Sequence, residues 1–127
     1  VEKGYTTLET FEAAIEASDL VVNLRYPTVG ETSGTMTRAM GAGKPVVVFR
    51  HGSFMEPPAG SVAGVPLDTF DTTGLSKVCR GLLCDASRRE EIGREARSWA
   101  SSVTPAMSVR MQSAFLSECL TSCRTVR

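Results

Sequence analysis

Residues 25–35, RYPTVGETSGT, form the stretch of the chain whose side chains best suit ligand binding. Its glycines let a ligand approach the backbone closely. The stretch follows an apolar run at residues 20–24 and leads into a helix-like segment that ends near Gly43. A helix N-terminus in that position offers unpaired N–H groups and the positive end of the helix dipole, which favour phosphate. The small residues that would form this anion site, or cap the helix, are Gly30, Thr32, Ser33, Gly34 and Thr35.

Charged and aromatic side chains within and after this stretch have both a binding and a structural interpretation. Arg25 leaves the first apolar run, where it can reach an anion or pair with a carboxylate. Glu31 is the one carboxylate of the stretch, and near a helix N-terminus it would contribute about 0.3–1 kcal/mol through the dipole. Tyr26 offers a flat face for stacking, although Tyr-Pro pairs are also common in turns. His51, the single histidine, follows the second apolar run.

The flanking sequence predicts a strand–helix–strand unit that positions these residues. Apolar residues at 20–24 and 46–49 are consecutive rather than alternating, as in parallel strands covered on both faces. A helix over residues 33–42 lies between them, and its small side chains allow it to pack closely on a sheet. The stretch at 25–35 therefore falls outside the carboxyl end of a parallel strand, where such units bind ligands.

Helices are predicted on either side of this unit. Residues 7–18 show helical spacing, with Thr6 as N-cap and Glu9 completing a capping box. After an edge strand within residues 62–67, the remainder is helical, and Asp71 or Thr72 is the expected cap. Three apolar stripes are interpreted as facing the core: Leu75, Val78, Cys79, Leu82 and Leu83; Ile92, Ala96, Trp99 and Val103; and Met107, Met111, Phe115 and Cys119.

Length and composition predict one globular domain over residues 1–127. Fourteen basic and 14 acidic residues give zero net charge, which argues against a nucleic-acid partner.

The four cysteines form no Cys-x-x-Cys pair, so no metal site is predicted. Cys79 and Cys119 are expected to be buried thiols in a reduced, cytoplasmic setting. No apolar run approaches the roughly 20 residues of a membrane span, and no carboxylate pair indicates a glycosidase.

Two segments resemble a known family. Residues 19–35, DLVVNLRYPTVGETSGT, and residues 38–48, RAMGAGKPVVV, are similar to the C-terminal domain of retaining GT-B glycosyltransferases of the group 1, GT4-like family. That family shows a strand, a Glu-x-Phe-Gly turn, a helix with a second Glu before Ala-Met, and a Gly-x-Pro-Val-Val strand. The resemblance implies an α/β, Rossmann-like fold with a three-layer parallel sheet, flanking helices and a helical C-terminal third. It covers part of a GT-B C-terminal domain.

The resemblance also implies roles for individual residues. Glu31 matches a Glu that accepts hydrogen bonds from the donor sugar, and charged acceptors make the stronger bonds. The family's second Glu, which binds the nucleotide ribose, is replaced by Arg38. An arginine can neutralise phosphate or stack on a base, but it cannot accept from ribose hydroxyls. The predicted donor-binding set, beside Glu31, is Arg25, Gly30, Thr32, Ser33, Gly34, Thr35 and Arg38, with no metal or cofactor beyond the donor substrate.

These implications predict the nucleotide-sugar-binding part of a hexosyl transferase. Alone it is expected to be inactive, because the family's N-terminal acceptor domain has no counterpart in the sequence. Two alternatives are a non-catalytic interaction module derived from this fold and part of a GT-B nucleotide-sugar epimerase. The expected partners are the nucleotide sugar, the acceptor domain or another chain, and a second copy bound through an open sheet edge. The predicted compartment is the cytoplasm, with a peripheral membrane location open for the full-length enzyme.

Overall fold

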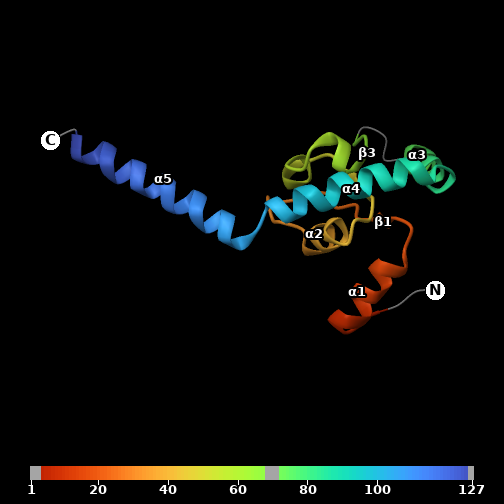
Figure 1. The fold of residues 1–127 in the computed structure, drawn as a ribbon. Coiled ribbons are helices and arrows are strands. Elements are labelled where there is room, and N and C mark those ends of the chain that lie inside the picture. Colours follow the sequence, from red (N-terminus) through yellow and green to blue (C-terminus); the bar gives the residue numbers. More distant parts are fainter. Residues whose placement is uncertain (1–3, 68–71, 126–127) are drawn as a thin grey trace.

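The computed structural model describes residues 4–67 and 72–125 and shows an α/β protein (Figure 1). Strands β1 (Val21–Val22), β2 (Val46–Phe49) and β3 (Ala63–Val65) form a parallel sheet in the order β1-β2-β3. This confirms the predicted class and the parallel arrangement. The helical elements are α1 (Leu8–Ala17), α2 (Gly34–Gly41), the short 3-10 turns η1 (Gly52–Met55) and η2 (Ala59–Ser61), α3 (Thr72–Cys84), α4 (Ala86–Ser102) and α5 (Pro105–Thr125).

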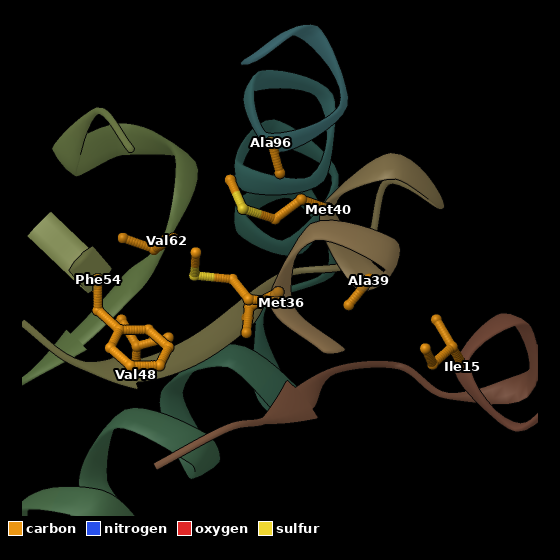
Figure 2. Close-up of a cluster of buried hydrophobic side chains, with 9 residues drawn as sticks. Ile15, Met36, Ala39, Met40, Val48, Phe54, Val62 and Ala96 are labelled. Atoms are coloured by element: carbon orange, nitrogen blue, oxygen red, sulfur yellow. The ribbon is translucent and has the colours of Figure 1, made fainter. Parts of the chain in front are cut away.

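The side chains of β2 contribute alternately to two buried clusters, one on each face of the sheet. Val46 and Val48 belong to the first cluster, and Val47 belongs to the second. In the second cluster Val47 packs with Val65 of β3. Helices therefore cover both faces, which is the coarse layout of a Rossmann-like fold. The first cluster (Figure 2) also contains Ile15, Met36, Ala39, Met40, Phe54, Val62 and Ala96, and the second also contains Leu82 and Ile92.

Helix α4 crosses the C-terminal end of α2 at a pair of glycines. Gly43, which follows α2, has a φ of 72°. A Cβ atom on Gly93 of α4 would overlap the carbonyl oxygen of Gly43, so the two backbones touch only because Gly93 has no side chain. Nearby, Arg97 of α4 donates from Nη2 to the carbonyl oxygen of Ala42 at 2.7 Å. These contacts fix the C-terminal end of α2.

Strand β1 is shorter and more exposed than predicted. It consists of Val21 and Val22 rather than residues 20–24, and Val22 is 47% exposed. Coverage of this strand on both faces is therefore a wrong prediction. Val21 packs against the first cluster, whereas Val22, which points to the opposite face of the strand, packs against neither cluster. The N-cap prediction for α1 is also wrong by one residue: Thr7, not Thr6, accepts from the backbone N–H of Thr10, at 3.3 Å.

Helix α5 is present as predicted, but its assignment to the core is wrong. Met107, Met111 and Phe115 are 46%, 66% and 64% exposed, and Cys119 is an exposed thiol. Figure 1 shows the reason: after the link that follows α4, α5 extends away from the sheet and the other helices. The core assignment is also wrong for Leu83 and Val103. Each lies at the end of its predicted stripe and is exposed.

Two further predictions concern the start of α3 and the membrane. Thr72 is the first residue of α3, so its prediction as the N-cap is wrong, and the alternative cap Asp71 lies outside the described residues. Among the helices of the described part of the chain, none combines the length and the apolar character needed to cross a bilayer.

Candidate functional site

Buried side chains tie the end of β1 to the start of α2. Asn23 and Ser33 are 8% and 1% exposed. Asn23 Nδ2 donates to Ser33 Oγ at 2.7 Å, and the same oxygen accepts from the backbone N–H of Met36 at 3.3 Å. Ser33 is therefore the N-cap of α2, as one of the sequence interpretations predicts. Sequence reasoning missed Asn23, although an amide inside the apolar run LVVNL was a signal for it.

The first two backbone N–H groups of α2 make no hydrogen bond with any described residue. Ser33 closes the first turn, since its carbonyl oxygen accepts from the N–H of Thr37 at 3.0 Å. The N–H groups of Gly34 and Thr35 precede that bond and make no hydrogen bond with any described residue. Gly34 is exposed, and a Cβ atom there would meet Arg38 Nη1 at 3.3 Å. The helix start thus lies at the surface with two donors available for an anion.

Glu31 lies in the turn that leads into this helix start, and the turn itself holds its carboxylate. Oε2 accepts from the N–H of Val29 at 2.8 Å and from the hydroxyl of Thr28 at 3.1 Å. The backbone N–H of Glu31 itself and then that of Val29 hold the pKa of the carboxyl below its usual value of 4.5, and Arg25, at 3.9 Å, lowers the pKa less. The side chain remains 40% exposed, so a ligand can reach the charged carboxylate.

The loop after β2 packs against the same turn. Ser53 Oγ donates to the carbonyl oxygen of Glu31 at 2.7 Å. Gly52 has a φ of 55°, and a Cβ atom there would lie 3.0 Å from Thr28 Cγ2. The rings of Tyr26 and His51 are 5.6 Å apart between centroids and tilted by 55°. The structure therefore brings the loops after two neighbouring strands together at the carboxyl edge of the sheet.

Arg38 lies between the start of α2 and α1. Its Nε donates to Glu12 Oε1 at 3.3 Å, and both side chains are about half exposed, at 45% and 52%. An exposed pair of this kind contributes about 0–1 kcal/mol, so an anion at the helix start can compete for the arginine. The remaining predicted residues also lie here: Thr32 and Gly30 are exposed in the turn, Gly30 with a φ of 92°, and Thr35 is half-buried in the first turn of α2.

Comparisons with known proteins give no relative for this site. No protein-family model matches the chain, and no curated protein or solved structure is significantly similar to it. Within residues 4–67 and 72–125, no three His, Cys, Asp or Glu side chains are grouped so that they could hold a metal ion. The chemistry of the site is therefore interpreted from the geometry of its own residues.

The lowered pKa of Glu31 predicts a pH dependence of stability. Its folded-state pKa lies below the unfolded value, so the charged carboxylate contributes stability that is present above pH 4.5 and is lost as the pH falls through the folded-state pKa. We expect Glu31→Gln to lower the Tm at pH 7 and to have a smaller effect at pH 3. Thermal unfolding monitored by circular dichroism tests this. The control is Glu90→Gln, on the exposed surface of α4. An equal loss at both pH values for Glu31→Gln would contradict the expectation.

Proposed function

We propose that the β1–α2–β2 unit binds the diphosphate of a nucleotide sugar and that the chain is the donor-binding part of a glycosyltransferase. One observation carries the proposal: Gly34 at the start of α2 is exposed, its neighbour Ser33 is hydrogen-bonded to Asn23 at the end of β1, and a carboxylate with a lowered pKa, Glu31, lies in the same turn. The bond between Asn23 and Ser33 holds the helix start in place before a ligand arrives. The N–H groups of Gly34 and Thr35, which have no partner among the described residues, are thereby preorganised for an anion.

The position of Glu31 narrows the class of ligand. A carboxylate beside an anion site repels a simple phosphate, so its presence favours a ligand that also has neutral donors. The hydroxyls of a sugar are such donors, and two adjacent hydroxyls match the two oxygens of a carboxylate. The lowered pKa keeps Glu31 charged at neutral pH, so that it acts as an acceptor. Arg25, 3.9 Å from Glu31, offsets part of its charge and supplies a cation for the phosphate.

Glycosyl transfer from such a donor makes few demands on side chains. The protein must orient the sugar and stabilise the negative charge that develops on the departing diphosphate. Glu31 would orient the sugar, and the start of α2 with Arg25 would stabilise the leaving group. The resemblance of residues 19–35 and 38–48 to GT4-like enzymes supports this assignment. We expect the chain alone to bind the donor without turnover, because residues 29–32 of the turn are exposed to solvent.

Calorimetric titration of the protein with UDP, GDP and ADP tests the proposal. We expect one of the three to bind and Arg25→Ala to weaken binding about tenfold, as for the loss of one charge-assisted hydrogen bond. Arg88→Ala is the matched control, because Arg88 is also an exposed arginine paired with a glutamate, Glu91. Arg88→Ala should leave the affinity unchanged. Equal losses for the two variants, or no heat with any nucleotide from folded protein, would overturn the proposal.

A second candidate function is a non-catalytic interaction module. The exposed apolar side chains of α5 favour it, because such a surface on a folded protein marks an association site. The replacement of the family's second Glu by Arg38 also favours it, since an arginine cannot accept hydrogen bonds from ribose hydroxyls. The titration separates the two functions: an interaction module without a donor site would give no heat with nucleotides.

A further inference from the structure

Arg50 is a half-buried arginine whose charged group lacks an acceptor. It follows β2 directly, at the carboxyl edge of the sheet. Its Nη1 atom is buried and makes no hydrogen bond with any described residue. None of the ion pairs among the described residues includes Arg50. A buried donor without an acceptor costs free energy, more so when it is charged, and such groups are rare in folded proteins.

Arg89 is the other half-buried arginine among the described side chains, and its guanidinium has acceptors within the chain. Nη1 of Arg89 donates to the carbonyl oxygens of Leu82 at 2.6 Å and of Leu83 at 2.9 Å. These carbonyls lie in the last turn of α3, so the fold itself satisfies this arginine. No described residue does the same for Arg50, and a bound group is left as the source of its acceptor.

Strand β3 determines the direction of the Arg50 side chain. Gly64 of β3 pairs with Val48 of β2, and a Cβ atom on Gly64 would lie 2.8 Å from Cδ and 2.9 Å from Cγ of Arg50. The aliphatic part of Arg50 therefore fills the space that a side chain on Gly64 would need. The N–H of His51 donates to the carbonyl oxygen of Phe49 at 2.9 Å, so Arg50 is the middle residue of a tight turn. Its side chain runs from the end of β2 toward β3, away from β1.

We propose that Arg50 binds an oxyanion, a carboxylate or a phosphodiester, between the carboxyl ends of β2 and β3. A planar guanidinium matches two oxygens of either group in a bidentate pair. The carboxyl ends of parallel strands are also where α/β proteins hold ligands. The side chain is half-buried rather than enclosed, which leaves a path from solvent to the guanidinium. This site is separate from the proposed donor site, because β2 lies between Arg50 and the turn that follows β1.

NMR titration of isotope-labelled protein with acetate and with dimethyl phosphate tests the site. We expect saturable shifts of the Arg50 Nε–H signal and of the backbone amides of His51 and Gly64, with a Kd in the millimolar range. The probe that binds more tightly identifies the group as a carboxylate or a phosphodiester. Arg50→Met should abolish these shifts. Arg25→Ala, in the proposed donor site, should leave the Kd within about twofold, as expected for independent sites.

Gly64→Ala tests the geometry while keeping the charge. Its methyl group would overlap the aliphatic part of Arg50 and displace the guanidinium, so the Kd should rise about threefold to tenfold. Gly81→Ala is the matched control, since a Cβ atom on Gly81 would meet no atom within 4 Å. It should leave the Kd unchanged.

Thermal unfolding in a chloride buffer free of other anions tests whether the guanidinium lacks an acceptor. Arg50→Met should raise the Tm by about 2–5 °C, because it removes an unsatisfied donor while a methionine still packs against Gly64. Arg89→Met should instead lower the Tm by about 2–5 °C, because the carbonyls of Leu82 and Leu83 lose their donor.

Four outcomes overturn the proposal. They are the absence of saturable shifts with either probe, shifts that Arg50→Met leaves in place, an unchanged Kd in Gly64→Ala, and a Tm that Arg50→Met lowers or leaves unchanged. Shifts that Arg25→Ala abolishes would also overturn it, since they would place the anion at the start of α2. Each result can be obtained whether or not the protein binds nucleotides, so the proposed donor site is tested separately.

Discussion

Gly93→Ala is expected to lower the free energy of unfolding by about 2–3 kcal/mol, although alanine is the better helix former by about 1 kcal/mol. The added methyl group would overlap the carbonyl oxygen of Gly43, which is a backbone atom and cannot rotate away. The helices α2 and α4 must therefore separate. Separation also weakens the bond from Arg97 to Ala42 and loosens the packing of Met40 and Ala96 in the buried cluster.

Urea unfolding of the two proteins measures this loss, and Gly81→Ala is the control. Gly81 is also a helical glycine, but it is exposed and a Cβ atom there would meet no atom within 4 Å. Gly81→Ala should stabilise the protein by up to about 1 kcal/mol, as helix propensity alone predicts. If Gly93→Ala proved neutral or stabilising, the close crossing of α2 and α4 would be wrong.

The crossing could not be predicted from the sequence. Gly93 lies inside a long helical pattern, where a glycine indicates only a locally weaker helix. Its partner Gly43 is recognisable as a helix terminator, but nothing local indicates that the two meet. By contrast, β2 was predictable because three consecutive valines after Pro45 specify a strand buried on both faces, and Val46, Val47 and Val48 are each 0% exposed.

The position of the candidate site could be predicted from the sequence, but the side chains that hold it in place could not. The glycine and hydroxyl pattern of residues 25–35 located the turn and the cap at Ser33. It did not identify Asn23, Ser53 or Glu12, because each of these contacts joins residues that are more than nine positions apart. Helix α5 shows the same limit. The spacing of Met107, Met111 and Phe115 indicates that a face will be covered, but it does not say by which surface.

Ser33→Ala is expected to destabilise the protein by about 2–3 kcal/mol, more than the loss of a helix cap alone. The cap accounts for about 1 kcal/mol. The remainder comes from the Asn23 amide, which is buried and would lose the acceptor that lies 2.7 Å away. Thr7→Ala removes the cap of α1, which is exposed and supports no buried group, and should cost about 0.5–1 kcal/mol.

A double-mutant cycle with Asn23→Ala separates these two contributions. In the Asn23→Ala background no buried amide is left unpaired, so Ser33→Ala should cost only the cap, and the coupling energy should be about 1–2 kcal/mol. Equal costs in both backgrounds would show that the two side chains act independently. The cycle also bears on the site, because the proposed donor binding requires α2 to begin at a fixed point on the sheet. Ser33→Ala should therefore weaken nucleotide binding at temperatures where the protein remains folded, whereas Thr7→Ala should not.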